Sequence, residues 1–184
     1  MSVLAEIMEY NRNFVENKKY EEFRTTKYPD KGIVILTCMD TRLIELLPRA
    51  MNLRNGDAKI IKNAGAMVTH PFGSIMRSIL VAVYELQAKE VFVVGHHDCG
   101  MTSLKPGSVL EKMKQSGISE DRIETLQHAG IELDKWLTGF NSVAESVKQT
   151  VYNIKKHPLF PPHSAVHGLV IHPETGKLDL VVKG

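Results

Sequence analysis

An alternation of strand-like and helix-like segments constrains the fold most strongly. Short apolar runs typical of buried strands occupy residues 33–37, 58–62 and 91–95. Apolar residues at helical spacing occupy residues 43–51 and 74–86 between these runs. The order strand, helix, strand, helix, strand predicts parallel pairing with right-handed crossovers. We therefore expect an α/β fold with a parallel-centred β-sheet flanked by helices.

The remaining segments add a terminal hairpin and further helices. Residues 165–171 and 177–182 read as two strands joined by a tight turn, so the fold should end in a C-terminal hairpin strand. Helical spacing also covers residues 108–115, 119–127 and 143–156. No internal repeat or linker interrupts the 184 residues, and this length suits one domain. We expect residues 1–184 to form a single α/β domain.

Two predicted helices carry apolar faces of different kinds. Residues 3–23 place their apolar side chains on one face of a polar helix. This helix could pack on its own domain or across a partner subunit, and the pattern fits both. Residues 74–86 are apolar on more than one face, which predicts a buried helix.

Composition excludes several functional classes. A net charge of +2 without a basic run argues against a nucleic-acid partner. The first residues lack the apolar core of a signal peptide, and no apolar run is long enough to cross a bilayer, so we expect no membrane partner. Two cysteines without an export signal predict a cytoplasmic protein, where thiols bind metal or react more often than they form disulfides.

Both cysteines follow predicted strands. Cys38 follows the first strand, and His96 and Cys99 follow the third. Each residue alone would more often be structural, but the carboxyl ends of neighbouring strands bring the three together. Closed zinc sites commonly use four cysteines, or three with a histidine, and this chain has only two. Three protein ligands with one position left open is the pattern of a catalytic zinc.

Asp40 and Arg42 follow Cys38 at spacings of two residues. Asp40 is an alternative fourth ligand, or it can accept a hydrogen bond from a metal-bound water. Arg42 can hold Asp40 through a two-pronged hydrogen bond, which keeps the carboxylate ionised and competes with the metal for it. Two thiolates cancel the charge of Zn²⁺, so the bound water is acidified less than at a site of three histidines. We therefore expect activity to rise toward alkaline pH.

A small-residue loop follows the second strand. Asn63, Ala64 and Gly65 would allow backbone N–H groups to approach a substrate or anion, although a tight strand-to-helix turn explains the same residues. We expect His97 and Asp98 to be loop residues that ligate no metal.

These motifs resemble those of the β-class carbonic anhydrases, in their compact prokaryotic branch. Cys38, Asp40 and Arg42 match the family pattern Cys-x-Asp-x-Arg, and His96 and Cys99 match His-x-x-Cys. The resemblance implies one Zn²⁺ per subunit on the two cysteines and the histidine, with an Asp-Arg dyad. It implies reversible hydration of carbon dioxide to bicarbonate by a zinc-bound hydroxide. It also implies a homodimer or a dimer of dimers with the sites near the subunit boundary.

The loop after the second strand matches the family pattern, whereas the region before that strand departs from it. The run Asn63-Ala64-Gly65 resembles the family's Asn-Ala-Gly loop. The larger plant-type branch carries a Gln near its pocket, and Asn52-Leu53-Arg54 stands where that residue is expected. This departure leaves open how bicarbonate is held.

Three other functions compete with carbon dioxide hydration. The expected fold and ligand set also resemble those of the hydrolases that act on carbonyl sulfide or carbon disulfide. A non-catalytic zinc-binding protein would close its site with Asp40 as the fourth ligand. A nucleotide-binding module ranks lowest, because the sequence lacks a Gly-x-Gly-x-x-Gly or phosphate-loop motif.

Overall fold

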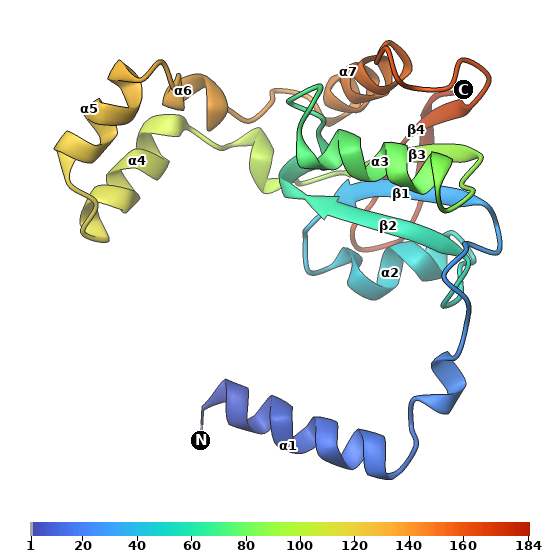
Figure 1. Cartoon of the computed structure of the whole chain (residues 1–184). Coiled ribbons are helices and arrows are strands. Elements are labelled where there is room, and N and C mark those ends of the chain that lie inside the picture. The colour runs from blue at the N-terminus through green and yellow to red at the C-terminus, as the bar shows by residue number, and fades with distance from the viewer. Residues whose placement is uncertain (1) are drawn as a thin grey trace.

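A five-stranded sheet with helices on both faces organises the computed structural model, which describes residues 2–184 (Figure 1). The strand order is β2-β1-β3-β4-β5. The strands span Ile33–Cys38 (β1), Ala58–Asn63 (β2), Glu90–His96 (β3), Ala165–Ile171 (β4) and Leu178–Val182 (β5). The first four are parallel, and β5 pairs antiparallel with β4. The predicted parallel-centred sheet and its C-terminal hairpin are confirmed.

Alternating side chains of the strands divide the core between the two faces of the sheet. On one face, Val34 belongs to a buried cluster with side chains of α3 (Ser74–Tyr84) and α7 (Val143–Lys155). On the other face, Ile35 belongs to a cluster with α2 (Leu43–Ala50). Successive strand residues point to opposite faces, so one buried strand feeds both clusters. The central strands are therefore held rigidly, and the loops that follow them start from fixed positions.

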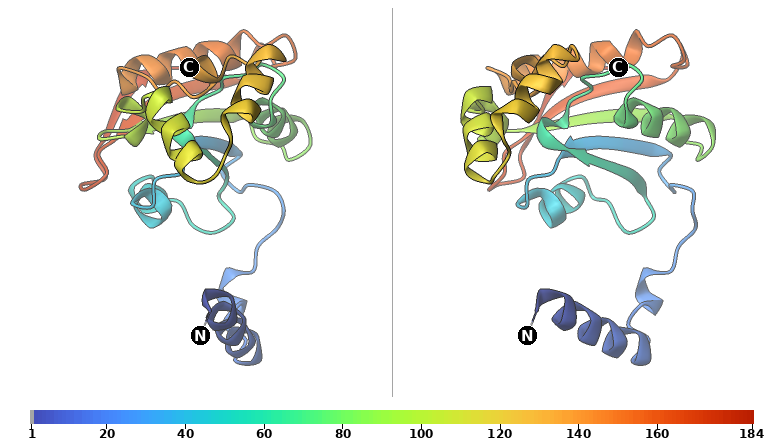
Figure 2. Two further views of the ribbon diagram at one scale, coloured as in Figure 1. Left: turned by 90° about the vertical axis from the view of Figure 1, so that its left-hand side faces the viewer. Right: turned by 60° about the vertical axis from the view of Figure 1, so that its left-hand side comes forward.

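The N-terminal helix stands away from the sheet (Figures 1 and 2). α1 spans Val3–Glu16 and contains no buried residue. The helix predicted over residues 3–23 was too long: α1 ends in a Schellman motif, with Lys18 in left-handed backbone (φ 53°) and Lys19 N–H bonded to the Phe14 carbonyl. A short 3-10 turn, η1 (Glu21–Phe23), then leads toward β1.

The segment of the chain that joins β3 to α7 contains three short helices, which project from the sheet (Figure 2). They are α4 (Pro106–Gln115), α5 (Glu120–His128) and α6 (Leu133–Trp136). The first two were predicted within two residues of their ends, whereas α6 has only one turn and was not predicted.

α3 is less buried than its sequence predicts. Met76 and Ile79 face the core, but Val81 is 43% exposed and Tyr84 is 60% exposed. The expectation of a buried helix was wrong, because one side of α3 packs on the core while Val81 and Tyr84 stay partly exposed, although Tyr84 reaches Leu159. Among residues 2–184, no helix is both long enough and apolar enough to cross a membrane.

Candidate metal centre

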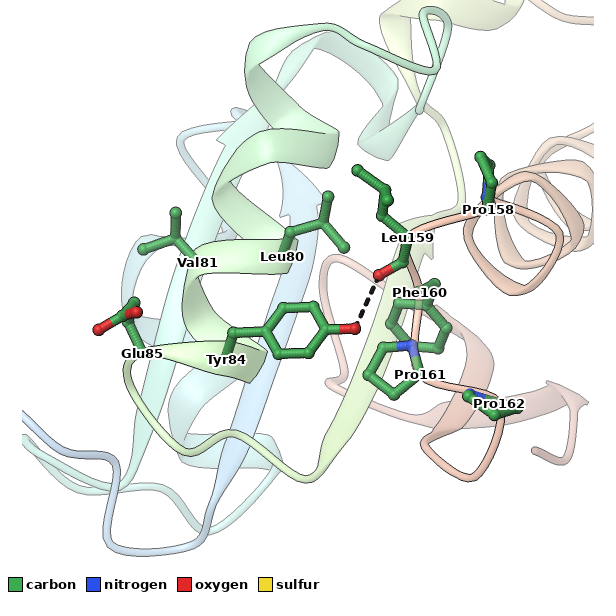
Figure 3. A pocket seen from close by; sticks show the side chains of 9 residues that line it. All are labelled: Leu80, Val81, Tyr84, Glu85, Pro158, Leu159, Phe160, Pro161 and Pro162. Atoms are coloured by element: carbon green, nitrogen blue, oxygen red, sulfur yellow. Dashed lines mark hydrogen bonds between the residues drawn. The ribbon is translucent and has the colours of Figure 1, made fainter.

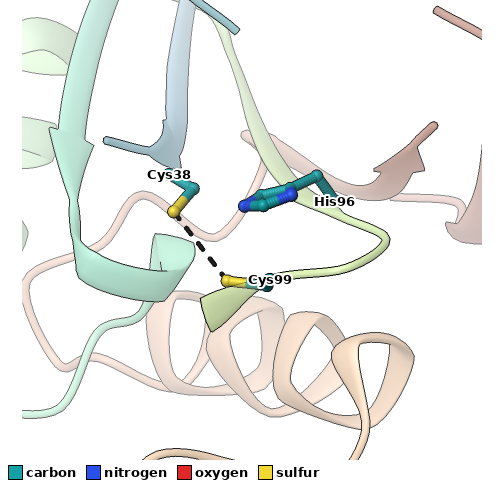
Figure 4. A group of neighbouring side chains, drawn as sticks. All are labelled: Cys38, His96 and Cys99. Carbon is teal, nitrogen blue, oxygen red and sulfur yellow. Dashed lines mark hydrogen bonds between the residues drawn. The ribbon is translucent and has the colours of Figure 1, made fainter. Parts of the chain in front are cut away.

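The carboxyl ends of β1 and β3 bring the three predicted ligands together (Figure 4). The two strands are adjacent and parallel, so both end at the same edge of the sheet. Cys38 is the last residue of β1, His96 is the last of β3, and Cys99 precedes the turn η3 (Gly100–Thr102). The sulfurs of Cys38 and Cys99 lie 3.9 Å apart, and the ligand atoms of all three residues lie within 4.8 Å of one another.

The orientation of His96 fits a metal ligand. Its Nδ1 lies 2.8 Å from the carbonyl of His97, and a carbonyl can only accept, so Nδ1 carries the hydrogen. The lone pair of the ring is therefore on Nε2, the tautomer that ligation through Nε2 requires. Nε2 is buried and has no hydrogen-bond partner among the described residues. A buried acceptor left unpaired is costly, and a cation between Nε2 and the two sulfurs would satisfy it.

The two thiols differ in their ease of ionisation. Burial opposes ionisation of Cys38, but the adjacent His96 ring and the backbone N–H groups of Gly65 and Asp40 outweigh it and lower its pKa to about 7. Burial, reinforced by the neighbouring Cys38, raises the pKa of Cys99 to about 11. Two soft sulfur donors and one imidazole are a donor set that suits zinc.

The loop after β2 closes over Cys38. Gly65, in the turn η2 (Ala64–Ala66), donates its N–H to Cys38 Sγ at 3.4 Å. Its φ of +83° and a Cβ position only 2.9 Å from Phe140 leave no room for a side chain. The Asn63 side chain is bonded to both the N–H and the carbonyl of Met67. In the predicted substrate loop, the backbone N–H of Gly65 therefore points at the predicted ligand Cys38, while the Asn63 amide is used in hydrogen bonds within the loop.

Asp40 and Arg42 form the predicted pair beside the ligands. Arg42 Nε donates to Asp40 Oδ1 at 3.0 Å, and Nη2 donates to Oδ2 at 2.8 Å. These hydrogen bonds lower the pKa of Asp40 to about 2, so the carboxylate is ionised at neutral pH. Oδ2 also lies 3.7 Å from His96 Nε2. An ionised oxygen held by arginine therefore lies at the edge of the ligand cluster.

Asp98 contacts the same arginine, a contact that the sequence did not predict. Arg42 Nη1 donates to Asp98 Oδ2 at 2.9 Å, and Nη2 donates to the Asp98 carbonyl at 3.0 Å. The available signal was an acidic residue directly before a predicted ligand. That signal was weak, because the partner of an exposed loop carboxylate depends on the loop conformation.

An apolar groove lies away from this cluster (Figure 3). It has a volume of about 590 Å³ and lies between the second half of α3 and residues 158–162, beside the amino ends of β3 and β4. Within it, the Tyr84 hydroxyl donates to the Leu159 carbonyl at 2.9 Å. None of the predicted site residues lines the groove.

Comparisons with known proteins agree with the ligand cluster. The family model for carbonic anhydrases matches residues 33–178. The chain is 63% identical over 184 residues to the Bacillus subtilis protein named "Putative carbonic anhydrase YtiB", covering 100% of this chain and 98% of that one. A β-carbonic anhydrase structure from Trichomonas vaginalis superposes with a TM-score of 0.91 at 36% identity, covering 100% of both chains.

A more distant relative carries a different name. A carbon disulfide hydrolase of Acidithiobacillus thiooxidans is 27% identical over 176 residues, covering 90% of this chain and 85% of that protein. The family match spans most of the chain, and the fold and the Cys-His-Cys cluster agree with it. The chain therefore belongs to the β-class carbonic anhydrases, zinc lyases that convert carbon dioxide and water reversibly to bicarbonate.

Proposed function

We propose that Cys38, His96 and Cys99 hold the zinc ion of this carbonic anhydrase and that Asp40 and Arg42 serve the reaction beside it. One observation carries the proposal most directly. The unpartnered Nε2 of His96 lies among two sulfurs and close to an arginine-held carboxylate oxygen. A purely structural cluster would gain nothing from a buried acceptor without a partner.

Zinc in such a site supplies a Lewis acid that lowers the pKa of water and so makes a nucleophile available near neutral pH. In the net reaction, water adds to the carbon of carbon dioxide, and bicarbonate and one proton leave. Asp40 Oδ2 is positioned to accept a hydrogen bond from the attacking water or hydroxide and so to orient it. Because its pKa is about 2, Asp40 holds no proton of its own at neutral pH.

Arg42 supports an open fourth position on the metal. Both oxygens of Asp40 are already hydrogen-bonded to Arg42, so ligation by Asp40 would have to break at least one charge-assisted bond. This competition favours Asp40 as an orienting acceptor over Asp40 as a fourth ligand. A non-catalytic zinc protein closed by Asp40 is correspondingly less favoured.

The decisive experiment combines metal analysis with a stopped-flow carbon dioxide hydration assay on the purified protein. We expect one zinc per chain and hydration that rises toward alkaline pH, since two thiolates reduce the acidifying effect of zinc. Sulfide release from carbonyl sulfide and carbon disulfide is measured on the same preparation. Hydrolysis of either sulfur compound without carbon dioxide hydration would replace the proposed substrate, and a rate that is flat with pH would remove the electrostatic explanation.

We also propose a homodimer, or a dimer of dimers, in which α1 packs on a partner subunit. The helix has no buried residue in its own chain, and Leu4 and Ile7 are 69% and 59% exposed. Such an apolar stripe gains stability only by contact with another surface. Leu4→Asp with Ile7→Asp should shift the protein toward monomers in sedimentation velocity, whereas Asn13→Asp, an added charge at an exposed position on the opposite face of the same helix, should not.

Compartment and partners follow from the same proposal. Both cysteines are unpaired, and zinc ligation requires reduced thiols, which supports a cytoplasmic protein. Its partners would be carbon dioxide and bicarbonate, without nucleic acid or membrane. Fractionation of cells that express the tagged chain would test this, and recovery in the membrane or exported fraction would contradict it.

A further inference from the structure

Asp98 occupies a conformationally unusual position between two of the proposed ligands. Its φ is 53°, in the left-handed region that Asp and Asn tolerate better than most residues. In this conformation Asp98 presents two acceptors to Arg42. Its carboxylate accepts from Nη1 at 2.9 Å, and its carbonyl accepts from Nη2 at 3.0 Å.

Arg42 is consequently held from both sides. Asp40, in the loop after β1, binds Nε and Nη2, and Asp98, in the loop after β3, binds Nη1 and Nη2. A guanidinium group is a planar fork, so contacts to all three of its nitrogens fix its rotation as well as its position. Nη2 joins the two sides directly, since it donates to the Asp98 carbonyl and to Asp40 Oδ2. That Oδ2 is the oxygen 3.7 Å from His96 Nε2.

Folding stability does not explain the carboxylate of Asp98. Its side chain is 83% exposed, and that of Arg42 is 38% exposed. Ion pairs this exposed to solvent contribute little to the free energy of folding. Gly or Asn would suit the left-handed backbone equally well. The specific effect of an aspartate here is to fix the arginine that holds Asp40.

We propose that Asp98 is a positioning residue for the reaction, holding Arg42 so that Arg42 keeps Asp40 Oδ2 directed at the ligand cluster. The inference rests on the proposed function and deepens it. Without the Asp98 carboxylate, Arg42 is anchored mainly to Asp40, and the two side chains can move together away from the cluster. Asp98 reaches the ligand cluster only through Arg42, so its loss should act on kcat and leave KM unchanged.

The kinetic test uses two variants that keep the backbone conformation, Asp98→Gly and Asp98→Asn. Asp98→Gly should lower kcat about 10-fold, with KM and zinc content unchanged, as for loss of other groups that orient a metal site. Asp98→Asn retains a hydrogen-bond acceptor without the charge, so its kcat should fall less than that of Asp98→Gly. Asp179→Asn is the matched control: it removes an exposed carboxylate 3.9 Å from His97 that pairs with Lys177, and it should behave as wild type.

A second readout follows Arg42 itself and needs neither zinc nor activity. Nitrogen-15 NMR of the zinc-free protein should show slow rotation of the Arg42 guanidinium, identified by its loss in Arg42→Lys. Rotation should become measurably faster in Asp98→Gly, because Nη1 loses its partner, and stay unchanged in Asp179→Asn. Unchanged rotation in Asp98→Gly overturns the inference whatever happens to kcat, and so does an unchanged kcat. A wild-type protein that hydrates no carbon dioxide overturns the proposed function instead, and the spectra then decide alone whether Asp98 holds Arg42.

Discussion

The candidate metal centre and the groove beside α3 are two regions that invite a functional interpretation, and they differ in chemistry. The groove is large and apolar and lies near the amino ends of β3 and β4. The Tyr84 hydroxyl in its lining donates a hydrogen bond to the Leu159 carbonyl, which also lines it. The metal centre instead gathers two buried thiols, an imidazole nitrogen without a partner among the described residues and an ionised carboxylate at the carboxyl ends of β1 and β3. Convergent polar groups, rather than cavity size, identify the site.

The position of each region in the sheet explains the difference. Parallel strands direct their following loops to one edge, so chemically active residues from separate parts of the chain meet there. The groove forms where the partly exposed helix α3 meets a proline-rich connection. Apolar side chains dominate its lining, which holds one carboxylate, Glu85, and no histidine or cysteine.

Loss of a proposed ligand should have the largest effect. Cys38→Ser should remove zinc and reduce carbon dioxide hydration by more than the ~10- to 100-fold typical for loss of an outer partner of a metal ligand. Leu159→Ala in the groove should change neither zinc content nor rate. Elemental analysis and stopped-flow kinetics measure both. A groove variant that lost activity would break the distinction between the two regions.

Arg42→Lys should have the next largest effect. Lysine cannot form the two-pronged bond to Asp40 or reach Asp98 with the same geometry, so kcat should fall about 10- to 100-fold with zinc retained. Arg49→Lys is the matched control, since Arg49 forms an exposed pair with Glu45 on α2. An unchanged rate in Arg42→Lys would show that Arg42 acts only through its positive charge, which lysine keeps.

Zinc binding should release protons in a pH-dependent number. Ligation requires both thiols to be ionised and His96 to be neutral. Near pH 8.5, Cys38 with its pKa of about 7 is mostly ionised and Cys99 with its pKa of about 11 is not, so about one proton should be released. Below pH 7, Cys38 is protonated in the zinc-free protein, so zinc binding should displace its proton as well. His96, whose pKa is raised by Cys38 against the effect of burial, should add to the number of protons released.

Zinc affinity should therefore fall as pH falls, steeply below about pH 7. Calorimetric titration of the zinc-free protein in buffers of different ionisation enthalpy gives the proton count directly. A count that does not vary between pH 6 and pH 9 would contradict the assigned ligands.

A smaller effect, on stability, should separate the loop over the metal centre from open loops. Gly65→Ala places a methyl group against Phe140 in left-handed backbone and should lower the free energy of unfolding by about 2 kcal/mol or more. Gly130→Ala has nearly the same φ, +84°, and no atom within 4 Å of the added Cβ. It isolates the backbone cost, which should be about 1 kcal/mol. Urea unfolding of the zinc-free variants provides the comparison, and equal losses would remove the packing explanation.

Local sequence patterns predicted the central strands because burial on both faces leaves continuous apolar runs. They were less reliable at the periphery. The end of α1 at Glu16 depends on Lys18 adopting left-handed backbone, for which no glycine marks the place. The exposure of Val81 and Tyr84 depends on what else covers α3, which its own apolar pattern does not contain.

For the site, the sequence by itself determined the candidate ligand set. Cys38, His96 and Cys99 each end or follow a buried strand, and parallel pairing brings such ends together whatever the details of the loops. Only the tertiary structure decided that Asp98 shares Arg42 with Asp40 and that the imidazole nitrogen of His96 has no protein partner. Those facts depend on the conformation of the loops and the direction of the side chains. Both are set by contacts between residues that are far apart in the sequence.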